Sequence, residues 1–202
     1  MQNFKSEDLT NFDRVDGEAR NLASIGHAVN YPNTIIHPDT LHLLDDISSL
    51  DNLKEAFKKV KANKGAPGID NLSVSAVKDN LSFYLKEIQE QLKTMSFKPS
   101  PVKRVRIPKP SGGERALGIP TVIDRIVQQA ILQIIVPFFD SQFSDQSFGF
   151  RKGKSAHQAV KTAQIFVKDG KNVTLSIDFK QCFDMINHNL LIHQIRKRIS
   201  DK

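Results

Sequence analysis

Residues 173–188 of this chain read VTLSIDFKQCFDMINH. Their first half alternates between apolar and polar residues, as a β-strand with one buried and one exposed face does. A strand over Val173–Phe179 presents Asp178 on its polar face, near the C-terminal end, and we expect helices to cover the apolar face. A carboxylate placed there is suited to Mg²⁺, which takes a few protein oxygens and leaves positions for substrate phosphates. The alternative is that Asp178 caps the following turn, the commoner role of an isolated strand-end Asp.

Helices are predicted on both sides of this strand. A helix capped by Ser155 and closed by Asp169-Gly170 precedes it, and a final helix begins at about Asn189. Further upstream, apolar residues at helical spacing predict a helix that begins after Ser49 and stops near Gly65.

Residues 102–119 have the pattern of a β-hairpin. Arg alternates with Val and Ile, and the chain then turns through Pro110-Ser111-Gly112-Gly113. Helices are predicted after Ser73 and after Thr121, so that the hairpin lies between helical segments. The order of helices, hairpin, helices, strand and helix indicates an α+β fold, with helices packed on a β-hairpin and a short antiparallel sheet.

The composition excludes several classes of protein. The 202 residues carry a net charge of +7, which favours a polyanionic partner such as nucleic acid. A single cysteine rules out an intrachain disulfide, and the sequence contains neither a secretory signal nor an apolar run long enough for a membrane span. We therefore expect a cytoplasmic protein of bacterial type that has no membrane partner, with an organelle as the alternative.

Four blocks of the sequence resemble, in order, the motifs of group II intron-encoded reverse transcriptases, a family that includes maturases. The blocks are KANKGAPGID (61–70), the region 104–130 that contains RVRIPKP, LGIPT and IDRIVQQA, then SFGFRKGKSAH (147–157), and SIDFKQCFDMINH (176–188). The resemblance implies the fingers and the first part of the palm of a right-hand polymerase. The expected domains are a partly ordered leader over 1–48, fingers with an N-terminal extension motif over 49–170, and the start of the palm over 171–202.

The resemblance also implies roles for individual residues. In this family the first palm Asp binds both catalytic metals, the next residue lends its backbone carbonyl, and an aromatic five residues on stacks under the incoming sugar. These roles fall on Asp178, Phe179 and Phe183, with Mg²⁺ in a two-metal site as the cofactor. The cations on either side of the hairpin turn, Lys109 and Arg115, correspond to those that grip the dNTP triphosphate. The alternatives are a core aromatic for Phe183 and a solvated basic turn for the two cations.

A glycine loop and several basic residues correspond to the regions that contact the template strand in this family. Members of this family use the corresponding loop as a lid over template and primer. The loop also fits a helix C-cap followed by a turn, and each cation also fits an ordinary surface charge. The candidates for template or RNA binding are Lys64, Gly65, Pro67, Gly68, Lys103, Arg104, Arg106, Arg125, Arg151, Lys152 and Lys154.

The implied function is RNA-directed DNA polymerase, in a parent protein that is also a maturase and binds intron RNA for splicing and mobility. The implied partners are the group II intron RNA, an RNA template, a DNA primer and dNTPs, and the oligomeric state is left open, a homodimer included.

The catalytic centre is expected to be incomplete in this chain. The family supplies a further carboxylate pair from an aromatic-Ala-Asp-Asp turn, whereas the one Asp-Asp of this sequence, Asp45-Asp46, precedes Asp178. We therefore expect the chain alone not to extend a primer. An RNA-binding maturase module without polymerase chemistry is the main alternative, and retron, diversity-generating and CRISPR-associated reverse transcriptases are a third.

Overall fold

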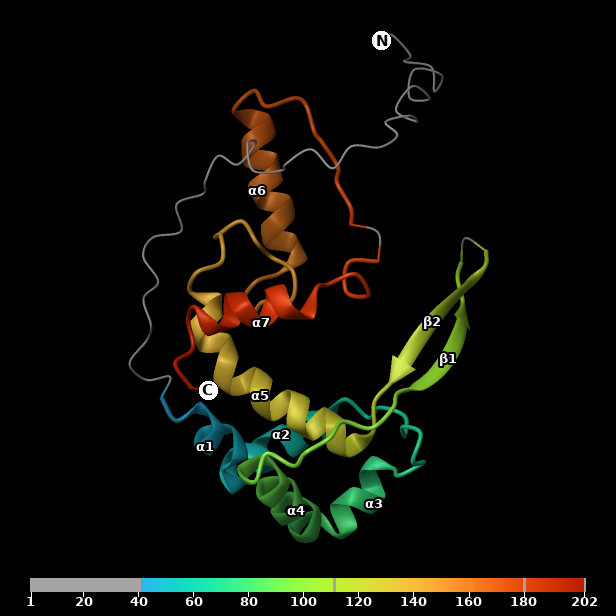
Figure 1. Cartoon of the computed structure of the whole chain (residues 1–202). Helices are drawn as coiled ribbons and strands as arrows, with labels where there is room; N and C mark the ends of the chain where they lie inside the picture. Colours follow the sequence, from blue (N-terminus) through green and yellow to red (C-terminus); the bar gives the residue numbers. More distant parts are fainter. Residues whose placement is uncertain (1–40, 111, 180, 202) are drawn as a thin grey trace, which may run out of the picture. The chain divides into compact units, whose positions relative to one another are not determined.

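A computed structural model describes residues 41–110, 112–179 and 181–201 of the chain (Figure 1). Its elements follow in the order α1 (Leu43–Ser48), α2 (Leu50–Ala62), α3 (Val74–Asp79), α4 (Leu81–Lys93), β1 (Lys103–Pro108), β2 (Glu114–Ile119), α5 (Val122–Asp140), α6 (Ala156–Lys168) and α7 (His188–Arg196). Most of the predicted leader lies outside the described residues, and its last part forms α1.

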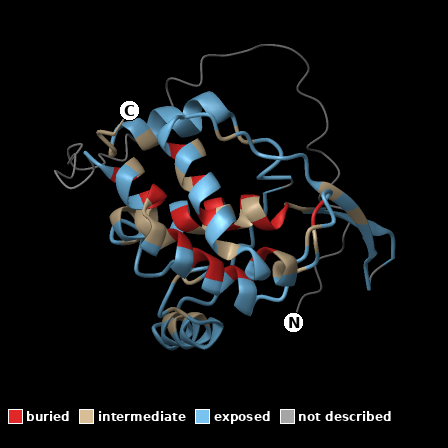
Figure 2. Cartoon of the chain, turned by 90° about the horizontal axis from the view of Figure 1, so that it is seen from below, coloured by how far each residue is buried: buried red, intermediate tan, exposed pale blue. Residues whose placement is uncertain are grey.

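The hydrophobic core lies among the first helices. α2 packs against α5, α1 contacts α2, α4 and α5, and α4 also contacts α2 and α5. Figure 2 shows the buried residues gathered on these helices, while β1, β2 and α6 are largely exposed. The buried apolar residues all come from α1 to α5: Leu43, Ile47, Leu53, Ala56, Phe57, Val60, Val77, Leu85, Ile88, Leu92, Val122, Ile126, Val127 and Ala130. The core of the described residues is therefore helical, and the finer prediction that helices pack on the hairpin is not confirmed.

The predicted helix starts are confirmed. The side chains of Ser49, Ser73 and Thr121 each accept a hydrogen bond from the backbone N–H three residues on, and Ser155 forms a capping box with Gln158. The helix predicted after Ser73 is divided, because Asn80 leaves the helical conformation (φ −121°, ψ 31°) between α3 and α4.

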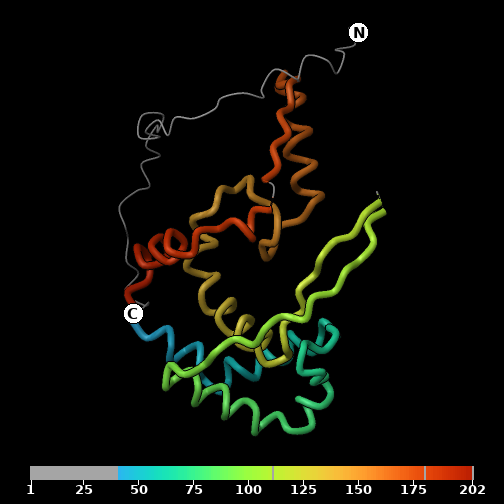
Figure 3. Tube along the Cα trace, turned by 45° about the vertical axis from the view of Figure 1, so that its right-hand side comes forward, coloured from blue at the N-terminus to red at the C-terminus, as the bar shows by residue number. Residues whose placement is uncertain are grey.

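The predicted hairpin is confirmed as well. β1 and β2 pair antiparallel, with Lys103 opposite Ile119 and Pro108 opposite Glu114. At the turn, Lys109 N donates to Gly113 O (3.0 Å) and Gly112 N donates to Lys109 O (3.1 Å). The two strands run side by side as an arm that leads back to the start of α5 (Figure 3). Together with the helices, this sheet gives an α+β fold.

The N-terminal half of α5 is a core element. Within the described residues α5 is the one helix long and apolar enough, by length and composition, to cross a membrane, and the core helix of a soluble protein passes the same test.

Asp124 is buried in the first turn of α5, where its carboxylate accepts hydrogen bonds from the Thr121 hydroxyl (2.6 Å) and from Ser100 N (3.2 Å). This network joins the start of α5 to the segment that leads into β1.

The predicted strand over Val173–Phe179 is not formed. These residues have no regular secondary structure, and their apolar face is open to solvent: Val173 is 93% exposed and Phe179 76%. A strand requires a neighbour to accept and donate its backbone hydrogen bonds, and the described residues supply a sheet of β1 and β2 only. The predictions of the strand and of helices covering its apolar face are therefore wrong for this structure.

Candidate functional site

The two faces of the hairpin carry different side chains. Residues directly opposite one another in an antiparallel pair share a face, and successive residues alternate between faces. Arg115 lies opposite Ile107, and Leu117 lies opposite Val105, so these four residues share one face. The other face carries Arg104 and Arg106, together with the Gly118 and Ala116 that lie opposite them. The hairpin therefore separates one set of cations from the other.

Lys109 and Arg115 meet at the open end of the first face. Both line one open pocket of about 540 Å³, whose other lining residues are Ile107, Pro108, Pro110 and Leu117. Among the described residues neither cation makes an ion pair or a side-chain hydrogen bond. Two free cations beside apolar side chains form a site suited to a polyphosphate, because the apolar walls leave the positive charges uncompensated.

The opposite face of the hairpin carries one paired and one unpaired arginine. Arg106 Nη1 lies 3.2 Å from Glu114 Oε2, at an exposed position where such a pair stabilises little. Arg104 has no partner among the described side chains. Lys103 lies by alternation on the first face, with Val105 and Ile107, and its Nζ donates to Asn71 Oδ1 (3.4 Å). These cations remain accessible to a second anion.

The glycine loop is seated on the start of α5. Arg125 Nη2 donates to Ala66 O (2.8 Å), and a Cβ added at Gly65 would lie 2.1 Å from Arg125 Nη1. A Cβ added at Gly68 would lie 2.6 Å from Thr121 Cα. Gly68 is therefore required by backbone contacts within the chain, whereas an added Cβ at Gly65 would meet only the end of the Arg125 side chain. Arg125 holds the loop, a role that sequence reasoning missed because its partner is a backbone carbonyl far away in the sequence.

The other candidates of the glycine loop, Lys64 and Pro67, are less constrained by contacts within the chain. Lys64, just before Gly65, adopts a left-handed conformation (φ 48°), and Pro67 is half-buried. That the loop also approaches a template stays a prediction.

Arg151 has a structural role. Its Nε and Nη2 bind the Asp140 carboxylate (2.8 and 3.2 Å), Nη2 also reaches Asp140 O, and Nη1 donates to Ser144 O and Ser147 O. These hydrogen bonds hold the pKa of Asp140 below its ordinary value and raise the pKa of Arg151. All five N–H donors of Arg151 are used, which leaves none for a template phosphate in this conformation. The Asp140 partnership gave no signal in the sequence.

The two lysines that follow Arg151 differ in their contacts. Lys154 Nζ donates to Asp145 O (3.1 Å) and lies 5.6 Å from the centroid of the Phe148 ring, whereas Lys152 has no partner among the described residues.

The residues expected at the metal are exposed. Phe183 is 88% exposed, and Asp178 has neither a hydrogen bond nor an ion pair within the described residues. No group of three His, Cys, Asp or Glu side chains able to hold a metal occurs in the described part of the chain. Asp178 offers one carboxylate, and a two-metal centre requires more, so the described residues do not fit a complete site.

Comparison with known proteins gives consistent results. A family model described as reverse transcriptase (RNA-dependent DNA polymerase) matches residues 107–201. Protein YkfC of Escherichia coli is 36% identical over 166 residues, which cover 79% of this chain and 43% of the relative. The group II intron-encoded protein LtrA of Lactococcus lactis is 36% identical over 148 residues, covering 72% of this chain and 24% of LtrA.

A yeast relative agrees with these two. The putative COX1/OXI3 intron 1 protein of Saccharomyces cerevisiae is 34% identical over 166 residues, covering 80% of this chain and 19% of that protein. The chain spans less than half the length of these curated relatives. The hairpin, the ordered motifs and these matches place the chain in the family of group II intron-encoded reverse transcriptases and maturases.

Proposed function

We propose that this chain supplies the fingers and the first part of the palm of an RNA-directed DNA polymerase that also acts as an intron maturase. In this proposal residues 1–48 are a leader, 49–170 the fingers and 171–202 the start of the palm. The observation that carries the proposal is the hairpin tip, where Lys109 and Arg115 line one pocket and have no side-chain partner in the part of the chain that the structure describes.

The tip suits the triphosphate of an incoming dNTP. A triphosphate carries several negative charges, and charge builds on the leaving pyrophosphate during phosphoryl transfer. Lys109 and Arg115 reach the pocket from opposite sides of the hairpin turn, so that they bind and orient the phosphates between them. Mg²⁺ would neutralise the same oxygens, and of the described residues Asp178, with the Phe179 carbonyl, would contribute ligands to it. Phe183 would contact the sugar.

The proposed partners are inferred from the basic residues of the chain and from the names of its relatives. Lys103, Arg104 and Arg106 would contact an RNA template paired with a DNA primer, together with Lys64, Lys152, Lys154 and the glycine loop. The relatives named as intron-encoded proteins suggest the group II intron RNA as a further partner. We assign Arg151 and Arg125 to holding the protein's own loops.

The test uses the hairpin's own two faces. In Lys109→Gln/Arg115→Gln we expect binding of a fluorescent dNTP to weaken by at least about tenfold, because two charge-assisted contacts are lost. The matched control, Arg104→Gln/Arg106→Gln, removes the same charge from the opposite face and is expected to change dNTP binding less than about twofold. Equal losses in both variants would mean that the tip is not a specific nucleotide site.

A second function has one observation in its favour. Asp178 is exposed and belongs to no group of three His, Cys, Asp or Glu side chains able to hold a metal among the described residues, which is compatible with an RNA-binding maturase module without polymerase chemistry. Strong binding of the chain to intron RNA over an unrelated structured RNA at matched salt, together with no dNTP binding, would favour this function.

A further inference from the structure

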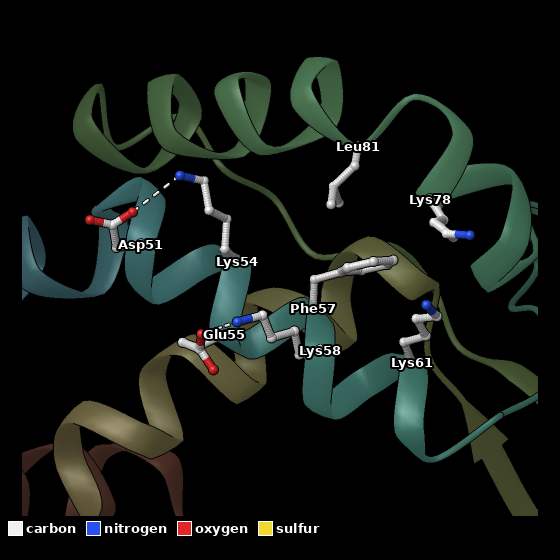
Figure 4. Close-up of a pocket in the computed structure, with 8 residues that line it drawn as sticks. All are labelled: Asp51, Lys54, Glu55, Phe57, Lys58, Lys61, Lys78 and Leu81. Atoms are coloured by element: carbon white, nitrogen blue, oxygen red, sulfur yellow. Dashed lines mark hydrogen bonds and ion pairs between the residues drawn. The ribbon is translucent and has the colours of Figure 1, made fainter.

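A second basic site lies away from the hairpin. The helices α2, α3 and α4 border an open groove of about 560 Å³ (Figure 4). The groove is lined by Asp51, Lys54, Glu55, Phe57, Lys58, Lys61, Lys78 and Leu81. None of these residues belongs to the dNTP or template candidates above.

The charges in the groove do not cancel. Lys54 Nζ lies 3.1 Å from Asp51 Oδ1, and Lys58 pairs with Glu55, each partner one turn away on α2. Both acidic groups are thereby neutralised. The amino groups of Lys61 and Lys78 have no ion pair or hydrogen bond among the described residues, so the groove retains two positive charges.

These two charges converge from different helices. Lys61 belongs to the last turn of α2 and Lys78 to the last turn of α3. Figure 4 shows their amino groups at the same end of the groove, beyond the outer edge of the Phe57 ring, with the Lys54–Asp51 pair at the other end. Phe57 is only 4% exposed and Leu81 is half-buried, so the floor beneath the amino groups is apolar. An apolar floor cannot screen the two charges, which strengthens their attraction for an anion.

We propose that this groove binds backbone phosphates of an RNA strand through Lys61 and Lys78. The groove is open, as a continuous strand requires. It also adjoins the glycine loop, because α2 ends at Ala62 and Lys64 begins that loop. An RNA that follows the loop therefore continues past Lys61 into the groove. The inference rests on the proposed function in taking RNA as the polyanion, and it does not depend on polymerase chemistry.

The test compares two charge-matched double variants of the whole chain. Lys61→Gln/Lys78→Gln removes the free cations of the groove, and Lys86→Gln/Lys93→Gln removes two exposed cations of α4 that do not line it. RNA affinity is measured at several salt concentrations. Losing two phosphate contacts lowers the magnitude of the slope of log affinity against log salt by about 1.4 to 1.8, and weakens binding roughly 14- to 30-fold at 0.15 M salt. The control is expected to keep the wild-type slope.

The outcomes separate the two proposals. If the wild-type chain binds no RNA, RNA binding fails and both proposals fall. If it binds, and the groove variant has the same slope as the control, this inference alone is wrong.

A further arm uses inorganic phosphate at constant ionic strength, observed through NMR signals of the lysine side chains. Phosphate binding at Lys61 and Lys78 without an effect of their substitution on RNA affinity would identify a site for a small free anion, and would overturn the assignment to RNA. Because both lysines are exposed, we expect unchanged far-UV circular dichroism in both variants.

Discussion

Gly68→Ala tests how the glycine loop is held on α5. The added Cβ would lie 2.6 Å from Thr121 Cα, 2.8 Å from Thr121 N and 3.0 Å from Pro120 C. All three are backbone atoms at the buried start of α5, so no flexible side chain is able to yield. Gly68 does not have a positive φ, and the cost is therefore steric. Overpacking of this kind costs about 2 to 3 kcal/mol, which corresponds to a fall in Tm of roughly 4 to 12 °C for a chain of this size.

The assay is urea unfolding followed by circular dichroism, with thermal melts as a second measure. Gly149→Ala is the matched control, because nothing lies within 4 Å of its added Cβ and its φ is not positive. It is expected to be neutral, or more stable by up to about 1 kcal/mol, since alanine restricts the unfolded chain. A Gly68→Ala protein as stable as this control would refute the seating of the loop against Pro120 and Thr121.

Three other predictions concern the loop after α5 and the catalytic centre. The folded pKa of Asp140 is depressed, so its pair with Arg151 stabilises the protein above the unfolded pKa of about 3.9, and this stability is lost as pH falls through the folded pKa. The check is a fall in the amide protection factors of residues 144–147 on acidification, after correction for the intrinsic pH dependence of exchange, and Asp140→Asn should remove that fall. In a longer protein that carries this chain with the remaining palm carboxylates, Asp178→Ala should abolish DNA synthesis and leave RNA binding largely intact; normal synthesis would remove Asp178 from the site. The 202-residue chain itself, given Mg²⁺, primer, template and dNTPs, should yield no extended product, and product from a preparation free of other polymerases would contradict this.

Local features were predictable from the sequence. The caps at Ser49, Ser73 and Thr121 each act within one helical turn, so the residues that decide them are adjacent in the chain. The hairpin was predictable for the same reason, because alternation and a glycine turn specify it locally.

Features that join distant segments were not predictable. The strand over Val173–Phe179 has the expected alternation, but pattern alone cannot supply the neighbouring strand. Arg125 reaches a carbonyl 59 positions away, so nothing near it in the sequence distinguishes it from a template-binding cation. The family resemblance implies that Arg151 contacts the template, which stays a prediction. It gave no sign that Arg151 also fastens the following loop to α5 through Asp140.

The exposed segment Val173–Phe179, between α6 and α7, affects how this chain behaves when it is expressed. The segment has seven residues with a strand-forming pattern, and Val173, Leu175 and Ile177 are each more than 70% exposed. Exposed apolar segments of this kind are bound by chaperones and cleaved by proteases. Production of this chain alone will consequently favour inclusion bodies, and soluble yield should rise when Ile177 is replaced by threonine, which keeps the branched shape and lowers the hydrophobicity.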